Sequence, residues 1–337
     1  MENILGAGPL SMDSSGMRKG SMSGEVAVVT GGAGNIGLAT ARALAWLGAR
    51  IVIAGRTQTT GEAAVDLVNQ ESGPNAAIFV QTDVSDENSM NNMAQKAFSQ
   101  FGKVDILVNN AMDMSLGTTI LKTTVQAMDR QYEVAVRGAL LGIKAFLPGM
   151  QERHHGVITY LSTTFRYPIG PSNYCAVKAA TSSMMMSLAY ELGPAEQTGI
   201  GVFMFLPTYV GKPRSGKGSP ASFQKPIATL RPSLIGYEKE VPAEDCGAAL
   251  AFCIAHAAEL HGSGTNVGQA QKRMHWPFPR PDRVPQKDFD RIRDPVMVRM
   301  FAYMGPGWGD HMDRMISINR SEAPADESLD PVDFYKD

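Results

Sequence analysis

Val26-Ala-Val-Val-Thr-Gly-Gly-Ala-Gly-Asn-Ile-Gly37 is the stretch of sequence that decides the fold. It begins with a β-branched run of strand length, continues with a glycine-rich turn and leads into the helix-forming residues 38–47. The turn fits the G-x-G-x-x-G pattern, in which glycines let the backbone approach a pyrophosphate at a helix N-terminus. In this setting we expect a dinucleotide-binding unit rather than a merely flexible loop.

Strand-like and helical patterns alternate along the chain, which is typical of an α/β fold with a doubly wound, Rossmann-like parallel sheet. The further strand-like runs are residues 50–54, 77–81, 105–109, 157–162, 201–206 and a short 264–268. Chemistry in such sheets gathers at the carboxyl ends of the strands. We therefore expect the residues that follow these strands to converge on one crevice.

The chain divides into one main domain and two flanking parts. We expect residues 1–23, rich in Gly, Ser and Met, to be a disordered leader. Residues 24–270 form the catalytic domain, in which the Gly-, Pro- and Ser-rich stretch 212–231 predicts a mobile lid. Residues 271–337 are a C-terminal extension, partly extended because of its prolines. This extension covers the substrate cleft, contacts a neighbouring subunit or trails, and the sequence leaves these three roles open.

The composition favours an enzyme of a reducing compartment. The 337 residues are 44% hydrophobic, with 31 Lys+Arg against 33 Asp+Glu, so a nucleic-acid partner is disfavoured. No apolar run approaches transmembrane length, so we expect no membrane partner. The three cysteines, Cys175, Cys246 and Cys253, lack metal-ligand spacing and an even count. We therefore expect buried thiols, a cytoplasmic protein and no metal site, the histidines included.

Tyr174 and Lys178 lie four residues apart at the start of a predicted helix. This spacing places both side chains on one face of the helix. A nearby ammonium lowers the pKa of a phenol from its reference value of about 10 toward the working range of a general acid or base. The same spacing also occurs by chance on solvated helices, so its weight depends on the other motifs.

In chain order the motifs resemble those of the short-chain dehydrogenase/reductase family, over roughly residues 24–270. The resemblance is carried by Thr30, Gly31 to Gly37, Asp83, Val84, Asn109 to Ala111, Ser162, Thr163, Tyr174, Lys178 and Pro207. It implies a nicotinamide cofactor, hydride transfer to or from a carbinol or carbonyl carbon, and Tyr174 as the general acid/base. It also implies that Lys178 lowers the pKa of that phenol and holds the nicotinamide ribose. A homodimer or homotetramer is the expected assembly.

Cofactor binding is expected along the whole crevice. The expected contacts are Gly31, Gly32, Gly34, Asn35, Ile36, Gly37, Arg56, Asp83, Val84, Asn110, Lys178 and Pro207. The same resemblance implies that the Asp83 carboxylate accepts a hydrogen bond from the adenine amino group. The segment 54–57, after the second strand, has no carboxylate to repel a 2′-phosphate, and Arg56 offers a planar charged fork that matches one. We therefore predict NADP(H) rather than NAD(H).

The chain also departs from the family pattern. Met112 replaces the glycine that usually follows Asn-Asn-Ala, and Ala135 replaces an asparagine that helps to hold a water chain to the lysine. The catalytic hydroxyl is either Ser162 or Thr163, and only one of these neighbours should face the site because strand side chains alternate. Lys212 takes the place of a threonine that, in the family, often contacts the carboxamide of the cofactor. Its ammonium either contacts the cofactor phosphates or is a solvated charge in a loop.

We expect an oxidoreductase that interconverts a secondary alcohol and a ketone with NADP(H), acting on an apolar or aromatic small molecule. Two alternatives stay open. The same site could reduce a conjugated double bond or transfer protons without redox chemistry. The departures at Met112 and Ala135 could instead mark a weakly active nucleotide-binding regulator, although the retained Tyr174 and Lys178 argue against it.

Overall fold

The computed structural model describes residues 15–163, 171–207 and 242–267, with residues 5, 7, 8, 10, 12, 210, 270, 273 and 274. All of these residues fall within the compact unit formed by residues 1–217 and 241–277. The predicted lid 212–231 and most of the extension 271–337, together with Lys212, lie outside the described residues.

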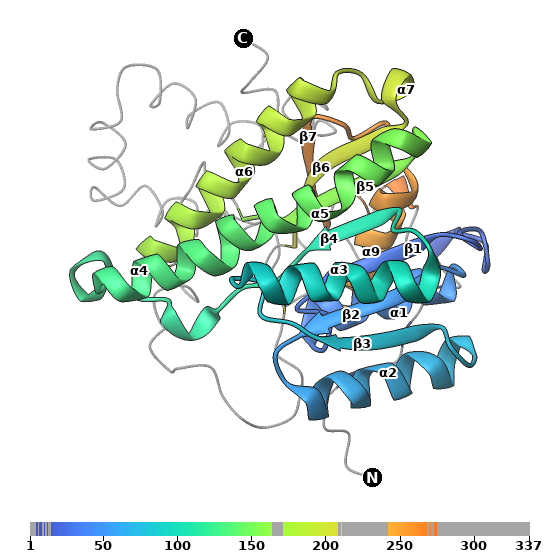
Figure 1. Ribbon diagram of the computed structural model, residues 1–337, viewed down its shortest axis with the longest axis horizontal. Coiled ribbons are helices and arrows are strands. Elements are labelled where there is room, and N and C mark those ends of the chain that lie inside the picture. The colour runs from blue at the N-terminus through green and yellow to red at the C-terminus, as the bar shows by residue number, and fades with distance from the viewer. Residues whose placement is uncertain are drawn as a thin grey trace, which may run out of the picture. The chain divides into compact units, whose positions relative to one another are not determined.

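One parallel sheet forms the centre of this unit, with the strand order β3-β2-β1-β4-β5-β6-β7 (Figure 1). The strands are β1 (Val26–Thr30), β2 (Arg50–Gly55), β3 (Ala77–Gln81), β4 (Ile106–Asn109), β5 (Gly156–Leu161), β6 (Ile200–Leu206) and β7 (Ser263–Asn266). Every pairing is parallel, which confirms the predicted doubly wound α/β fold.

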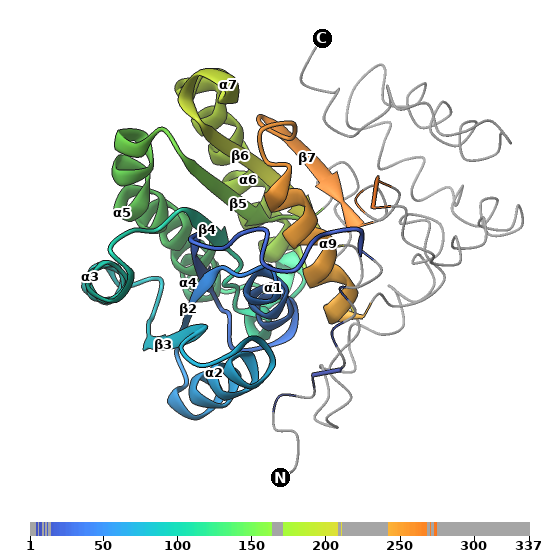
Figure 2. The same ribbon diagram turned by 90° about the vertical axis from the view of Figure 1, so that its right-hand side faces the viewer.

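Helices cover both faces of the sheet (Figure 2). They are α1 (Asn35–Trp46), α2 (Gln58–Ser72), α3 (Glu87–Phe101), α4 (Val125–Tyr132), α5 (Gly138–Arg153), α6 (Ser172–Leu192), α7 (Ala195–Thr198) and α9 (Ala243–Ala255). A π-helical turn, η4 (Glu133–Arg137), joins α4 to α5, and two short 3-10 turns, η2 (Met114–Leu116) and η3 (Ile120–Lys122), follow β4. Helices α1, α2 and α9 lie on one face and α3, α5 and α6 on the other. Within the described ranges, none of the helices is long and apolar enough to span a membrane.

Strand β1 lies in the middle of the sheet because its side chains are apolar on both faces. All five of its residues are buried, as is typical of a central parallel strand with helices on either side. Val28 pairs with Val52 of β2 and with Leu107 of β4. This register aligns the carboxyl ends of neighbouring strands and brings the residues that follow them to the same edge.

The described part of the predicted leader is folded. The N–H of Met22 donates to the carbonyl of Leu47 at 2.6 Å, just after α1. The Met12 side chain is 1% exposed, and the N–H of Gly8 donates to the Glu244 carboxylate at 2.5 Å. Residues 15–23 therefore belong to the domain, whereas we expected disorder, because backbone hydrogen bonds from Gly20 and Met22 to the end of α1 hold this segment in place.

Helix α9 packs closely on α1 through Gly247. A methyl group at this position would overlap the Ala39 carbonyl carbon and lie 2.6 Å from the Thr40 nitrogen. We expect Gly247→Ala to lower the free energy of unfolding by about 1–3 kcal/mol, because backbone atoms cannot move aside without shifting the helix. Urea unfolding followed by circular dichroism measures this loss.

Gly149→Ala is the matched control, since Gly149 is also a helical glycine. Its added methyl would meet the flexible end of Arg153, at 3.1 Å. Alanine favours a helix over glycine by about 1 kcal/mol, so this variant should be at least as stable as the parent. Equal stability of the two variants would show that the α1–α9 contact does not require glycine.

Candidate active site

The ends of β1 and β4 are fastened together by Thr30 and Asn110. The Thr30 hydroxyl accepts hydrogen bonds from the backbone N–H groups of Asn110 (3.0 Å) and Ala111 (3.2 Å) and donates to the carbonyl of Val108 (3.2 Å). The Asn110 amide donates to the carbonyls of Thr30 (2.8 Å) and Gly31 (3.1 Å). Asn110 was predicted to contact the cofactor, but its side-chain amide is engaged in this clip.

The glycines of the β1–α1 turn have two different functions. Gly31 has φ +63, and a methyl group there would lie 2.9 Å from the Asn110 amide nitrogen. A methyl group at Gly37 would lie 2.6 Å from the same nitrogen, so these two glycines permit the clip. At Gly34 a methyl group would meet no atom within 4 Å. This position therefore leaves open space at the start of α1, where a phosphate can approach the backbone.

Helix α1 begins in a way that suits an anion. Gly34 is its N-cap, no side chain caps the helix, and its first turn carries no acidic residue. The first N–H groups of a helix have no partner within the helix, and the helix dipole favours negative charge there. Asn35 has a φ of 47, in the left-handed region, and Ile36 is partly buried behind it. The turn therefore fits the pyrophosphate of a dinucleotide.

Arg56 follows β2 and reaches across the turn. Its side chain is 59% exposed, and its Nη1 lies 3.5 Å from Oδ2 of Asp113, in the loop after β4. The other carboxylate oxygen of Asp113 accepts hydrogen bonds from the backbone and hydroxyl of Ser115. We predicted no carboxylate near the 2′-phosphate from residues 54–57 alone. Asp113 was not predictable there, because nothing in the sequence links two segments that meet only in the fold.

Asp83, after β3, is also engaged. Its Oδ1 accepts hydrogen bonds from the backbone and hydroxyl of Ser85, and its Oδ2 lies 2.9 Å from Nη2 of Arg130. Burial raises the pKa of Asp83, but these hydrogen bonds and the Arg130 charge outweigh it and hold the pKa below its ordinary value. Val84 is buried next to it, and Pro207 follows β6 at the same edge. Arg130 lies on α4 and was not predicted.

The two candidate hydroxyls after β5 point in different directions. Thr163 is partly buried, and its side chain lies near enough to the Tyr174 phenol to lower the pKa of that phenol. Ser162 is 2% exposed, and its hydroxyl lies 2.6 Å from that of Ser182 on α6. The alternation expected for neighbouring residues thus continues just past the strand, and Thr163 is the one that meets the phenol.

Tyr174 and Lys178 lie in the first two turns of α6. Burial raises the pKa of Tyr174 to about 12, and the nearby Thr163 side chain partly offsets this rise. Lys178 is 4% exposed, and its Nζ donates to the carbonyl of Leu161, at the end of β5. The Nζ also lies 5.6 Å from the centre of the Tyr174 ring. The predicted pair is therefore together at the edge where the strand ends meet, with Lys178 buried and Tyr174 partly buried.

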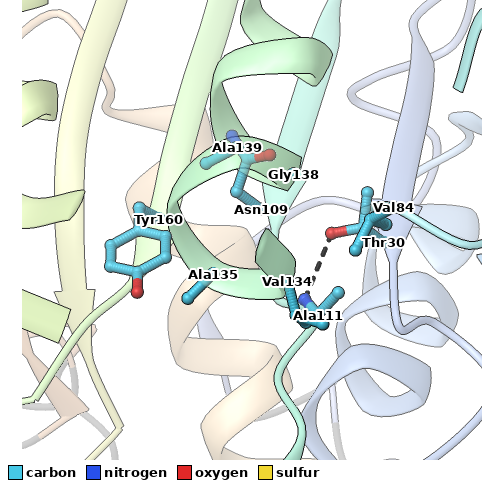
Figure 3. Close-up of a pocket in the computed structure, with 9 residues that line it drawn as sticks. All are labelled: Thr30, Val84, Asn109, Ala111, Val134, Ala135, Gly138, Ala139 and Tyr160. Atoms are coloured by element: carbon cyan, nitrogen blue, oxygen red, sulfur yellow. Dashed lines mark hydrogen bonds between the residues drawn. The ribbon is translucent and has the colours of Figure 1, made fainter. Parts of the chain in front are cut away.

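A small cavity borders this cluster. Its volume is about 10 Å³, which is room for about one water molecule. Figure 3 shows the residues that line it, with Thr30 and Tyr160 at opposite ends. The lining residues are Thr30, Val84, Asn109, Ala111, Val134, Ala135, Gly138, Ala139 and Tyr160. Ala135 belongs to the π-helical turn, a feature often found at functional sites. Two buried polar atoms of this lining, Asn109 Nδ2 and Tyr160 Oη, have no hydrogen-bond partner in the described part of the chain.

The opposite edge of the sheet carries a second group of ionisable residues, Glu25, Asp105 and His155. Asp105 is fully buried and accepts a hydrogen bond from the N–H of Val26 at 3.0 Å. Lys103 (2.8 Å) and Arg153 (3.3 Å) pair with the same carboxylate. Because these two cations already balance its charge, we assign the group to the packing of the strand ends.

Comparisons with known proteins agree with this geometry. A protein-family model described as short chain dehydrogenase matches residues 25–219. Cis-4-hydroxycyclohexanecarboxylate dehydrogenase of Sinomonas cyclohexanicum is 33% identical over 238 residues, which cover 70% of this chain and 91% of the relative. Cyclopentanol dehydrogenase of Comamonas testosteroni is 29% identical over 246 residues, with 72% and 95% covered.

A solved structure gives a similar match. The crystal structure of a candidate betaketoacyl-ACP reductase superposes with a TM-score of 0.61 at 30% identity. The superposition covers 73% of this chain and 96% of that chain.

The two hydroxyls after β5 can be separated by mutation. We expect Thr163→Val to lower kcat/KM by about 10²-fold or more, because it removes the hydroxyl that lies near the Tyr174 phenol. Ser162→Ala should leave kcat/KM close to that of the parent and cost about 1 kcal/mol of stability, since its hydrogen bond is internal. The reverse pattern would assign the role to Ser162. Initial rates and thermal melts of both variants provide the test.

Proposed function

The chain belongs to the short-chain dehydrogenase family, and from this premise we propose that it interconverts a secondary alcohol and a ketone with NADP(H). Membership makes it an NAD(P)-dependent oxidoreductase that acts on a small molecule. The observation that carries the finer proposal is that the partly buried Thr163 and Tyr174 lie with the buried Lys178 at the carboxyl edge of the sheet.

The residues present fit the cofactor. Gly34 leaves open space at the start of α1 for the pyrophosphate, and in this proposal Lys178 holds the nicotinamide ribose. When bound, the nicotinamide supplies the site that takes or gives the hydride. The protein side chains then manage the proton and the orientation of the substrate.

In this proposal Thr163 orients the substrate oxygen and Tyr174 exchanges a proton with it. Burial raises the pKa of Tyr174 to about 12, so the phenol of the cofactor-free protein is protonated, the form needed for ketone reduction. Alcohol oxidation needs the tyrosinate, and the Lys178 ammonium stabilises that form. The rate of oxidation should therefore rise with pH until Lys178 loses its proton.

Arg56 supports the choice of NADP(H). Its guanidinium is largely exposed at the end of β2, where a 2′-phosphate can form two charge-assisted hydrogen bonds. Asp113 opposes this choice, because its carboxylate competes for the same guanidinium. We propose that the 2′-phosphate displaces Asp113, which remains held by Ser115.

The substrate class, assembly and location are also proposals. The two dehydrogenase relatives are named for cyclic secondary alcohols, which supports a substrate of that kind. The similarity to a candidate betaketoacyl-ACP reductase supports a ketoacyl thioester as the second candidate. Leu140 on α5 and Tyr190 on α6 are 44% and 90% exposed, which supports a homo-oligomer. The three buried, unpaired cysteines fit the cytoplasm.

The proposed reaction is tested with the purified protein. Absorbance of the reduced nicotinamide reports turnover of cyclic alcohols, ketones, ketoacyl thioesters and enones with either cofactor. We expect Tyr174→Phe to lower kcat by about 10²–10⁴-fold, because it removes only the exchangeable proton, while the Kd for NADPH stays the same. Full activity of this variant would exclude Tyr174 as the proton donor. NADPH binding without turnover of any compound would favour the weakly active regulator.

The cofactor preference is tested with Arg56→Ala and Asp113→Asn. Arg56→Ala should raise the KM for NADPH by at least about tenfold, since one charge-assisted hydrogen bond contributes about 1.5–3 kcal/mol, and should leave NADH unaffected. Asp113→Asn should lower the KM for NADPH, because it removes the competing charge. Steady-state kinetics with both nucleotides measure the ratio. Equal effects of Arg56→Ala on NADPH and NADH would remove Arg56 from this role.

A further inference from the structure

The ammonium group of Lys178 is buried with little polar support. Its side chain is 4% exposed, and its Nζ donates to the Leu161 carbonyl. Within residues 15–163, 171–207 and 242–267 it has no ion pair with a carboxylate. Burial lowers the pKa of Lys178 to about 7, so its positive charge is close to being lost at neutral pH.

Ala135, which stands in the place of the family's asparagine, offers no polar side chain to Lys178. Ala135 is 2% exposed and forms an apolar cluster with Val136 and with Val177, the neighbour of Lys178. Met112 and Met128 pack against this cluster. The two departures from the family pattern, Met112 and Ala135, therefore meet at one place and make it apolar.

Tyr160 of β5 places an aromatic ring next to the Lys178 ammonium, which the apolar cluster does not support. Its ring centre lies 4.5 Å from Nζ of Lys178, closer than the ring of Tyr174 at 5.6 Å. Both distances are within the range of a cation–π contact, which strengthens when water is excluded. Tyr160 is 1% exposed, so its ring faces the ammonium in a desolvated place.

The hydroxyl of Tyr160 has no comparable function. No hydrogen bond of normal geometry reaches it from the described part of the chain, although Thr181 lies near enough to lower its pKa. Burial raises the pKa of Tyr160 well above its ordinary value, so this phenol stays neutral. Its ring is therefore the part that acts on Lys178.

Among the residues that the structure describes, no other charged group accounts for the state of Lys178. On α6 the facing titratable group is the Tyr174 phenol, and from β5 it is Tyr160. The charged residues of the π-helical turn, Glu133 and Arg137, are partly exposed and pair with each other at 3.5 Å. Arg130 on α4 pairs with Asp83 and with Glu133.

We propose that Tyr160 is a positioning residue whose ring keeps the Lys178 ammonium charged and in place. It thereby takes over part of the support that an asparagine at position 135 would give. The inference rests on the proposed function only in that Lys178 serves Tyr174, because the ring–ammonium contact is independent of any substrate.

The state of Lys178 can be measured without turnover. In the full-length protein labelled with ¹³C at lysine Cε, NMR follows the titration of Lys178, assigned by the signal lost in Lys178→Arg. We expect Tyr160→Leu to lower the midpoint by about one pH unit, the size of a desolvated cation–π contact. Tyr160→Phe keeps the ring and should leave the midpoint unchanged.

Phe146→Leu is the matched control. Phe146 is 1% exposed in the same hydrophobic core as Tyr160, and its ring packs edge-on against Phe98 instead of a cation. An unchanged midpoint in Tyr160→Leu, or an equal shift in Phe146→Leu, would overturn the proposal. If Tyr160→Leu does not fold, Tyr160→Met, which keeps more bulk without a ring, is judged by the same criteria.

The pH profile then shows whether the contact matters to the reaction. The alkaline limb of kcat/KM should move to lower pH in Tyr160→Leu by the same amount as the NMR midpoint, and should stay in place in Tyr160→Phe. A shifted midpoint with an unshifted limb would refute the link to catalysis. A parent enzyme without turnover would refute the proposed function alone, because the NMR titration still decides about Tyr160.

Discussion

The hydrogen-bonded clip between Thr30 and Asn110 is the constraint on which the rest of the site depends. It fixes the loop after β4 against the turn after β1, so the two central strands end in one rigid corner. The corner is so tight that no side chain fits at Gly31 or Gly37. Gly34 lies outside it and faces open space. The clip therefore requires glycine at positions 31 and 37 for packing, whereas glycine at position 34 leaves room for a ligand.

A second constraint is the burial of a positive charge. An isolated ammonium is costly to bury, and a carboxylate partner would offset that cost. Around Lys178, within the described residues, the groups that offset it are instead a carbonyl and two aromatic rings. Such neutral groups leave the ammonium free to act on Tyr174 and on a ribose, whereas a carboxylate would bind it firmly. The weak support is thus compatible with a catalytic use of this lysine.

Local patterns were enough to predict the fold. The run at residues 50–54 became β2, one residue longer, and the glycine turn began α1 because strand period and turn chemistry are local properties. The position of the site at one edge of the sheet was also predictable, because the carboxyl ends of parallel strands meet there. Contacts between distant segments were not predictable: Arg56 meets Asp113, and Arg130 meets Asp83, only after folding. The choice between Ser162 and Thr163 likewise depended on the rotation of the chain beyond β5. Tyr160 resembled any other core aromatic, since its effect depends on the lysine above it.

The folded leader has a consequence for the order of synthesis. Gly8 is hydrogen-bonded to Glu244, which lies 236 residues later in the chain. A ribosome adds residues from the N-terminus, so the leader emerges long before this partner exists. Closing so long a loop is entropically slow and follows the assembly of the sheet. Gly8 is therefore made long before Glu244 and is fastened to it late, and during translation its backbone stays accessible to whatever binds nascent chains.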